Sequence, residues 1–155
     1  MIHHRAHKGR HDSRSRGQAL AEFALVAPIF FLILFSIIDF GRYVYYVQIL
    51  NNAAREGARY AIVHGSNGLP SSGPPAPGFT SSDPTAANVK AVAKQHAIGV
   101  VGSAAVLRID AIYDQYNRRG DKVRVTIEYD FKSMIPIVPL PTITIKGEST
   151  LVINN

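Results

Sequence analysis

Glu22 is an ionisable side chain inside a strongly apolar stretch, which makes it the most informative candidate for a functional role. It is the only charged residue between Gly17 and Asp39, and residues 23–38 carry no charge. A carboxylate at such a position is costly in a membrane and usually serves a function, such as pairing with an opposite charge. The alternative is that Glu22 is the polar end of an ordinary membrane anchor and reaches back to the headgroups beside Arg16. We favour the functional role.

Patterns for catalysis and metal binding are missing from the sequence. It contains no G-x-S-x-G, H-E-x-x-H or G-x-x-x-x-G-K-[ST] motif, and it has no cysteine. We therefore predict that the protein is not an enzyme, has no cofactor and has no small-molecule substrate. Four histidines could suggest metal ligation, but they lie in a tail too polar and charged to fold by itself, so we expect no metal site: His3, His4, His7 and His11.

The positive charge is concentrated in the N-terminal tail. Most of the formal net charge of +6 comes from residues 1–17, where five basic side chains accompany one aspartate. A basic flank before an apolar segment stays in the cytoplasm, which predicts that residues 64–155 lie outside the cytoplasmic membrane. No A-x-A-like site follows the apolar run, which argues against an ordinary cleaved secretory signal. The arginines of the tail have no aromatic residues between them, so we expect no nucleic-acid binding.

One long helix is predicted over residues 18–63. Its apolar first half reaches the roughly 20 residues that are needed to cross about 30 Å of hydrocarbon. Pro28 lies inside this half, where membrane helices tolerate a proline. In the second half, small and aliphatic residues recur at spacings of three and four: Val47, Leu50, Ala54, Ala58 and Ala61. This pattern indicates a helix face that packs closely against a sheet or another helix.

A charge pair and three tyrosines mark the end of the apolar segment. Asp39 and Arg42 are about one helical turn apart and can form an ion pair. Tyr43, Tyr45 and Tyr46 are typical of the aromatic belt at a membrane interface. We predict that these five residues lie at the outer interface of the membrane.

A loop and a second helix are predicted next. Residues 64–84 are rich in Gly, Pro and Ser, which favours an exposed loop without helix or strand. The following helix is expected to have Ser82 or Asp83 as its cap, Pro84 in its first turn and Gly99 as its stop.

The remaining residues predict a small antiparallel sheet. Residues 122–131 alternate between apolar and polar side chains, and residues 105–113 and 142–153 form weaker strands. Three prolines exclude residues 134–141 from a central strand. The predicted fold class is therefore α+β, with a long N-terminal transmembrane helix that continues into a small α+β domain of residues 85–155.

Three segments resemble the TadE-like pseudopilins of tight-adherence (Tad, or Flp) pilus systems, which belong to the type IV pilin-like superfamily. They are Gly17-Gln-Ala-Leu-Ala-Glu-Phe-Ala-Leu-Val-Ala-Pro28, Asp39-Phe-Gly-Arg-Tyr43 and Ala53-Ala-Arg-Glu-Gly-Ala-Arg59. The resemblance covers residues 17–63.

The resemblance implies that a membrane prepilin peptidase cleaves after Gly17 and removes the basic leader of residues 1–17. Gln18 would become the new N-terminus, and Glu22 and Phe23 would act in assembly with other pilin-like subunits and the Tad machinery. Cleavage would create a positively charged α-amino group at the membrane face. The Glu22 carboxylate on a neighbouring helix could pair with that group.

These observations predict a single-pass membrane protein that acts in assembly of a Tad pilus or a related secretion or adhesion apparatus. The lipid bilayer, the prepilin peptidase and other subunits are the expected partners. The alternative is a binding or adhesion module outside the membrane, for which the uncleaved helix serves only as a tether.

Overall fold

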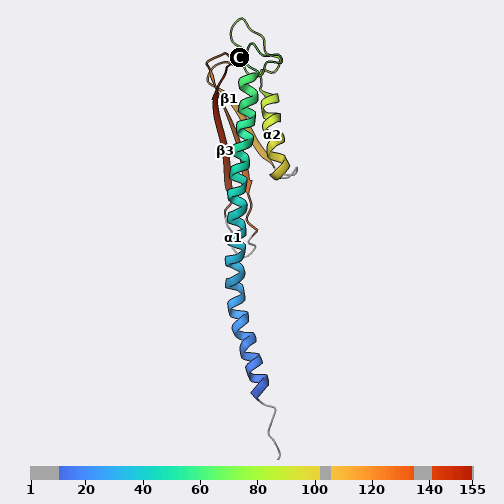
Figure 1. Ribbon diagram of the computed structural model, residues 1–155, viewed down its shortest axis with the longest axis vertical. Coiled ribbons are helices and arrows are strands. Elements are labelled where there is room, and N and C mark those ends of the chain that lie inside the picture. Colours follow the sequence, from blue (N-terminus) through green and yellow to red (C-terminus); the bar gives the residue numbers. More distant parts are fainter. Residues whose placement is uncertain (1–10, 102–105, 135–140, 155) are drawn as a thin grey trace, which may run out of the picture.

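The computed structural model describes residues 11–101, 106–134 and 141–154. Helix α1, His11–Val63, is a rod of 53 residues, and the rest of the described chain packs along its C-terminal part (Figure 1). At about 1.5 Å per residue, the rod is about 80 Å long. The structure confirms the α+β class, with a long helix followed by a small antiparallel sheet.

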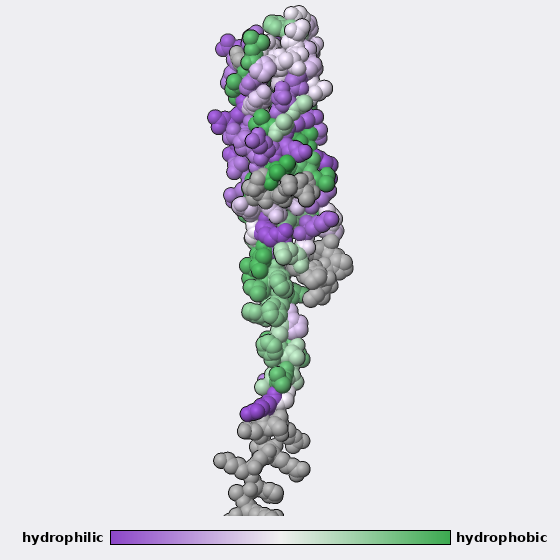
Figure 2. All heavy atoms as spheres, turned by 90° about the vertical axis from the view of Figure 1, so that its right-hand side faces the viewer, coloured by the Kyte–Doolittle hydropathy of each residue, from purple (hydrophilic) through white to green (hydrophobic). Residues whose placement is uncertain are grey.

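Helix α1 begins earlier than the predicted start at Gln18 and is continuous through Pro28. Extending an existing helix adds one hydrogen bond for each residue that is fixed, so a polar segment can join a helix that it could not start. The described chain has one helix that is long and apolar enough to cross a membrane. Only 6% of its most apolar window is buried, and Figure 2 shows the hydrophobic surface of this part below the more polar domain.

Three strands form the antiparallel sheet: β1 (Leu107–Tyr113), β2 (Lys122–Phe131) and β3 (Ile143–Val152). Their order is β1-β2-β3, and Ile127 of β2 is paired with Ile109 on one side and Gly147 on the other. The predicted strands are thus confirmed, with slightly shorter ends for β1 and β3. Residues 135–140, which were excluded from a central strand, lie outside the described residues.

Helix α2 spans Ala87–Val101, and both of its predicted ends need correction. The Asp83 side chain accepts hydrogen bonds from the backbone amides of Ala87 and Asn88. It therefore caps the helix as predicted, but Pro84 lies in the turn before the helix. Gly99 does not stop the helix, because a glycine in a helix interior costs only about 1 kcal/mol and does not force the chain out of it.

The core lies where one face of α1 meets the sheet and α2. Fully buried residues include Leu50, Ala54, Ala58 and Ala61 of α1, Val123, Val125 and Ile127 of β2, and Val89, Ala93 and Ala97 of α2. This confirms the packing face that the spacing in α1 indicated. Gly57 is part of this face, since a Cβ there would lie 2.9 Å from the Cβ of Ala93.

The segment 64–84 is only partly exposed, contrary to the expectation of an exposed loop. Ser72 is buried, its hydroxyl donates to the Asp83 carboxylate, and its carbonyl accepts from the side chains of Asn117 and Tyr113. Gly73 has a φ of 99°, which favours glycine, and its lack of a Cβ lets its backbone pass against the Tyr113 ring. Side-chain hydrogen bonds to distant residues therefore fold the segment, and composition alone does not reveal them.

Asp83 is expected to stabilise this end of the domain at neutral pH and to lose that effect in acid. Burial raises the pKa of Asp83, but hydrogen bonds from the Asn88 amide, the Ser72 hydroxyl and the Ala87 amide outweigh it and hold the pKa below the ordinary 3.8. A carboxyl with a lowered pKa stabilises the fold above its unfolded value, and the effect is lost as the pH falls through the folded value.

Asp83→Ala should cost about 0.5–2 kcal/mol at pH 7, as other losses of a helix cap do. The difference in unfolding free energy from the wild type should shrink at pH 2. Circular dichroism of the detergent-solubilised protein measures both values, and an undiminished difference at pH 2 contradicts a role for the charge.

Candidate functional site

The predicted processing and assembly residues lie together on the exposed surface of α1. Gly17, Gln18, Glu22 and Phe23 are all exposed, and a Cβ added at Gly17 would have nothing within 4 Å. The Gln18 amide donates to Oε1 of Glu22 at 3.1 Å across one helical turn. The four residues are thus accessible to a second protein, on a helix whose following segment is apolar.

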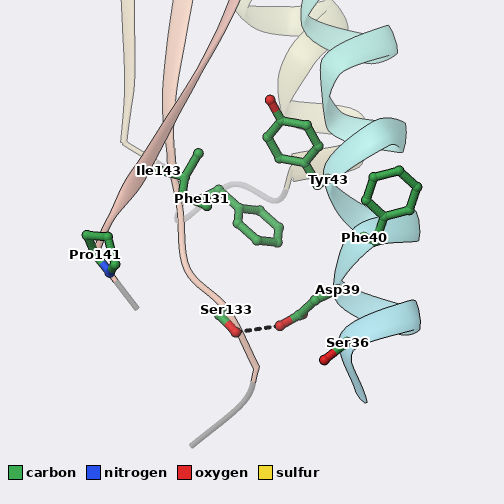
Figure 3. Close-up of a pocket in the computed structure, with 8 residues that line it drawn as sticks. All are labelled: Ser36, Asp39, Phe40, Tyr43, Phe131, Ser133, Pro141 and Ile143. Carbon is green, nitrogen blue, oxygen red and sulfur yellow. Dashed lines mark hydrogen bonds between the residues drawn. The ribbon is translucent and has the colours of Figure 1, made fainter. Parts of the chain in front are cut away.

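A second candidate site lies where the apolar part of α1 meets the domain. Asp39 is 8% exposed, and Nη1 of Arg42 donates to its Oδ1 at 2.8 Å, which confirms the predicted ion pair. The other carboxylate oxygen accepts from the Ser133 hydroxyl, as Figure 3 shows, and also accepts, at 2.9 Å, from the Met134 amide. Asp39 therefore joins the helix to the chain that follows β2, and sequence reasoning missed this contact.

The three tyrosines divide between two environments. Tyr43 and Tyr46 are half-buried against Phe131, with ring centroids 6.1 and 5.9 Å apart, whereas Tyr45 is exposed. The Arg42 guanidinium lies 5.2 Å from the centre of the Phe131 ring. Residues 43 and 46 share a helix face, and residue 45 projects about 100° from residue 46. Tyr43 and Tyr46 therefore help to hold the sheet against α1, and the position of the three tyrosines at the membrane interface stays a prediction.

A mainly apolar cavity of about 380 Å³ opens beside this cluster, as the close-up in Figure 3 shows. Helix α1 and the end of the sheet both contribute to its lining: Ser36, Asp39, Phe40, Tyr43, Phe131, Ser133, Pro141 and Ile143.

Within the residues that the structure describes, no three His, Cys, Asp or Glu side chains come together in a way that could hold a metal ion. His3, His4 and His7 lie outside those residues, and the His11 side chain is not described either.

One N-terminal helix that is long and apolar enough to cross a membrane indicates a single-pass membrane protein. Residues 17–59 match the family model described as TadE-like protein, which confirms the resemblance. The match covers Gly17, Glu22 and the Asp39–Arg42 pair, and it supports an association with Tad pili. No curated protein and no solved structure matches the chain.

Proposed function

We propose that this protein is a pilin-like subunit that acts in assembly of a Tad pilus or a related secretion or adhesion apparatus. A prepilin peptidase removes the leader after Gly17, and the chain then associates with other pilin-like subunits through α1. The N-terminus faces the cytoplasm, and the α+β domain lies outside the cytoplasmic membrane.

The observation that carries the proposal is the exposed segment from Gly17 to Phe23, about two helical turns, where the apolar part of α1 begins. An accessible glycine with no atom near it suits a protease. The segment to be cleaved then has no contacts that must be broken before it enters the active site. Glu22 is also accessible, and its single hydrogen bond among the described contacts comes from the neutral Gln18 amide. A carboxylate in an apolar setting is far more stable beside a positive charge. The new α-amino group of a neighbouring subunit supplies that charge.

The first test is the processing of a Gly17→Leu variant in cells that contain the peptidase. A bulky side chain at the cleavage position should leave the chain at full length in the membrane, whereas the wild type should begin at Gln18. N-terminal sequencing of protein from membranes and from sheared surface material measures this.

Gly41→Leu is the matched control, because Gly41 is also an exposed glycine of α1 with no atom within 4 Å of an added Cβ. Its processing should be normal. A wild-type chain that begins at Met1 or Ile2 in these cells would contradict the proposal and favour the uncleaved tether of a binding or adhesion module.

A further inference from the structure

The domain begins at the level along α1 where the hydrocarbon core of a bilayer would end. From Ala19 to Ile38 the helix is about 30 Å long, which equals the thickness of the hydrocarbon core of a bilayer. Asp39 is the first charged residue after this stretch. Because Asp39 accepts hydrogen bonds from Ser133 and Met134, the lower end of the domain lies at the level of Asp39.

This lower end is apolar, although it belongs to a domain whose other surfaces carry many charges. Met134 is 60% exposed and Phe40 69% exposed, and Ile143 is exposed as well. Met134 follows Ser133, which lines the cavity, and Pro141 lines it as well. A soluble domain rarely presents such residues together unless something covers them.

The cavity is continuous with the lipid-facing surface of α1. Ser36 and Phe40 line it from the helix, and both lie within or directly beside the apolar span. Phe131, Pro141 and Ile143 line it from the sheet side (Figure 3). Figure 2 shows the hydrophobic surface of the helix reaching the base of the polar domain. Molecules that surround the apolar part of α1 therefore also contact the cavity.

We propose that the base of the domain, formed by Phe40, Met134, Pro141 and Ile143, is a lipid-binding surface. Acyl chains of the adjacent leaflet enter the cavity, so that the domain rests on the bilayer and does not stand clear of it. Lys132 is exposed beside Ser133 and suits the phosphates of the headgroups. This inference needs only the membrane span and does not depend on pilus assembly.

The chain has no tryptophan, so the fluorescence of one introduced tryptophan reports the surroundings of that residue alone. The full-length protein is reconstituted in phosphatidylcholine vesicles with and without acyl-chain-brominated phosphatidylcholine, at several lipid-to-protein ratios. Met134→Trp and Ile143→Trp should emit at short wavelength, and brominated lipid should quench at least half of their emission at every ratio. Phe35→Trp, within the span, is the positive control, and Ile112→Trp, on the far face of the sheet and 59% exposed, is the negative control.

Quenching of Met134→Trp no greater than that of Ile112→Trp overturns the proposal. Short-wavelength emission that resists brominated lipid and disappears on dilution with lipid also overturns it, because a second copy of the chain then covers the base. Circular dichroism verifies the fold of each variant, and Met134→Trp is decisive because its exposed side chain can be enlarged without repacking. Processing after Gly17 is measured separately, so failure of the proposed function leaves this result unaffected.

Discussion

A Glu22→Ala strain is expected to insert and cleave the protein normally but to assemble little or no surface pilus. The substitution makes the helix more apolar, so neither membrane insertion nor access of the peptidase to Gly17 should suffer. It does remove the carboxylate that we propose pairs with a neighbour's α-amino group. Loss of one partner from a buried ion pair typically costs about 3–5 kcal/mol, and in a filament the loss recurs at each subunit contact.

Three measurements in parallel test this expectation: N-terminal sequencing, recovery of partner subunits by pulldown, and the yield of sheared surface pili. Glu22→Gln separates charge from shape, because it retains the size and a hydrogen-bonding oxygen, and it should fail like the alanine variant. Glu56→Ala is the matched control for removing a carboxylate from α1, since Glu56 pairs with Arg59 inside the domain region. Normal pilus yield with normal cleavage in Glu22→Ala would contradict the charge-pairing mechanism.

Gly147→Val is expected to abolish the packing of the domain against α1. A Cβ at Gly147 would lie 2.3 Å from the carbonyl carbon of Leu50 and 2.7 Å from the amide nitrogen of Asn51. These are backbone atoms of a continuous helix and cannot move aside as a flexible side chain could. Overpacking a core costs about 1–3 kcal/mol even where side chains can adjust, and valine adds two further methyl groups. A small domain has about 5–15 kcal/mol of stability in total, so much of it should be lost.

Thermal unfolding in detergent, followed by circular dichroism in the strand region, measures the effect. Gly147→Ala should show a smaller loss of the same kind. Gly41→Ala is the control, because it makes the same change on α1 where no atom lies within 4 Å, and it should be neutral or slightly stabilising. An unchanged unfolding temperature for Gly147→Val would mean that the sheet does not pack directly on the helix backbone.

Patterns with a fixed period predicted most of the fold. The alternation in residues 122–131 predicted β2 with its observed bounds. The spacing of small residues in α1 predicted its buried face. Both succeed because in a strand or a helix the spacing of residues determines which side each side chain faces. The ends of α2 were harder to predict from the sequence. Asp83 was recognised as a cap, but the start of the helix depends on which amides the carboxylate reaches.

Contacts between distant residues could not be predicted from local patterns. The Asp39–Arg42 pair follows from spacing on one helix, whereas the hydrogen bonds from Ser133 and Met134 depend on where the sheet docks along α1. The fold of the segment 64–84 depends in the same way on Asn117 and Tyr113, which lie more than 40 positions from Ser72.

The helix that carries the span also carries the domain, without a linker between them, and Asp39 fastens their junction. Any rotation or translation of α1 therefore moves the domain by the same amount. A shift of one residue in the register between two such helices raises the domain by about 1.5 Å and turns it by about 100°. If α1 packs against such a helix within the lipid, those contacts set the direction in which the polar face of the sheet points, in steps of about 100°.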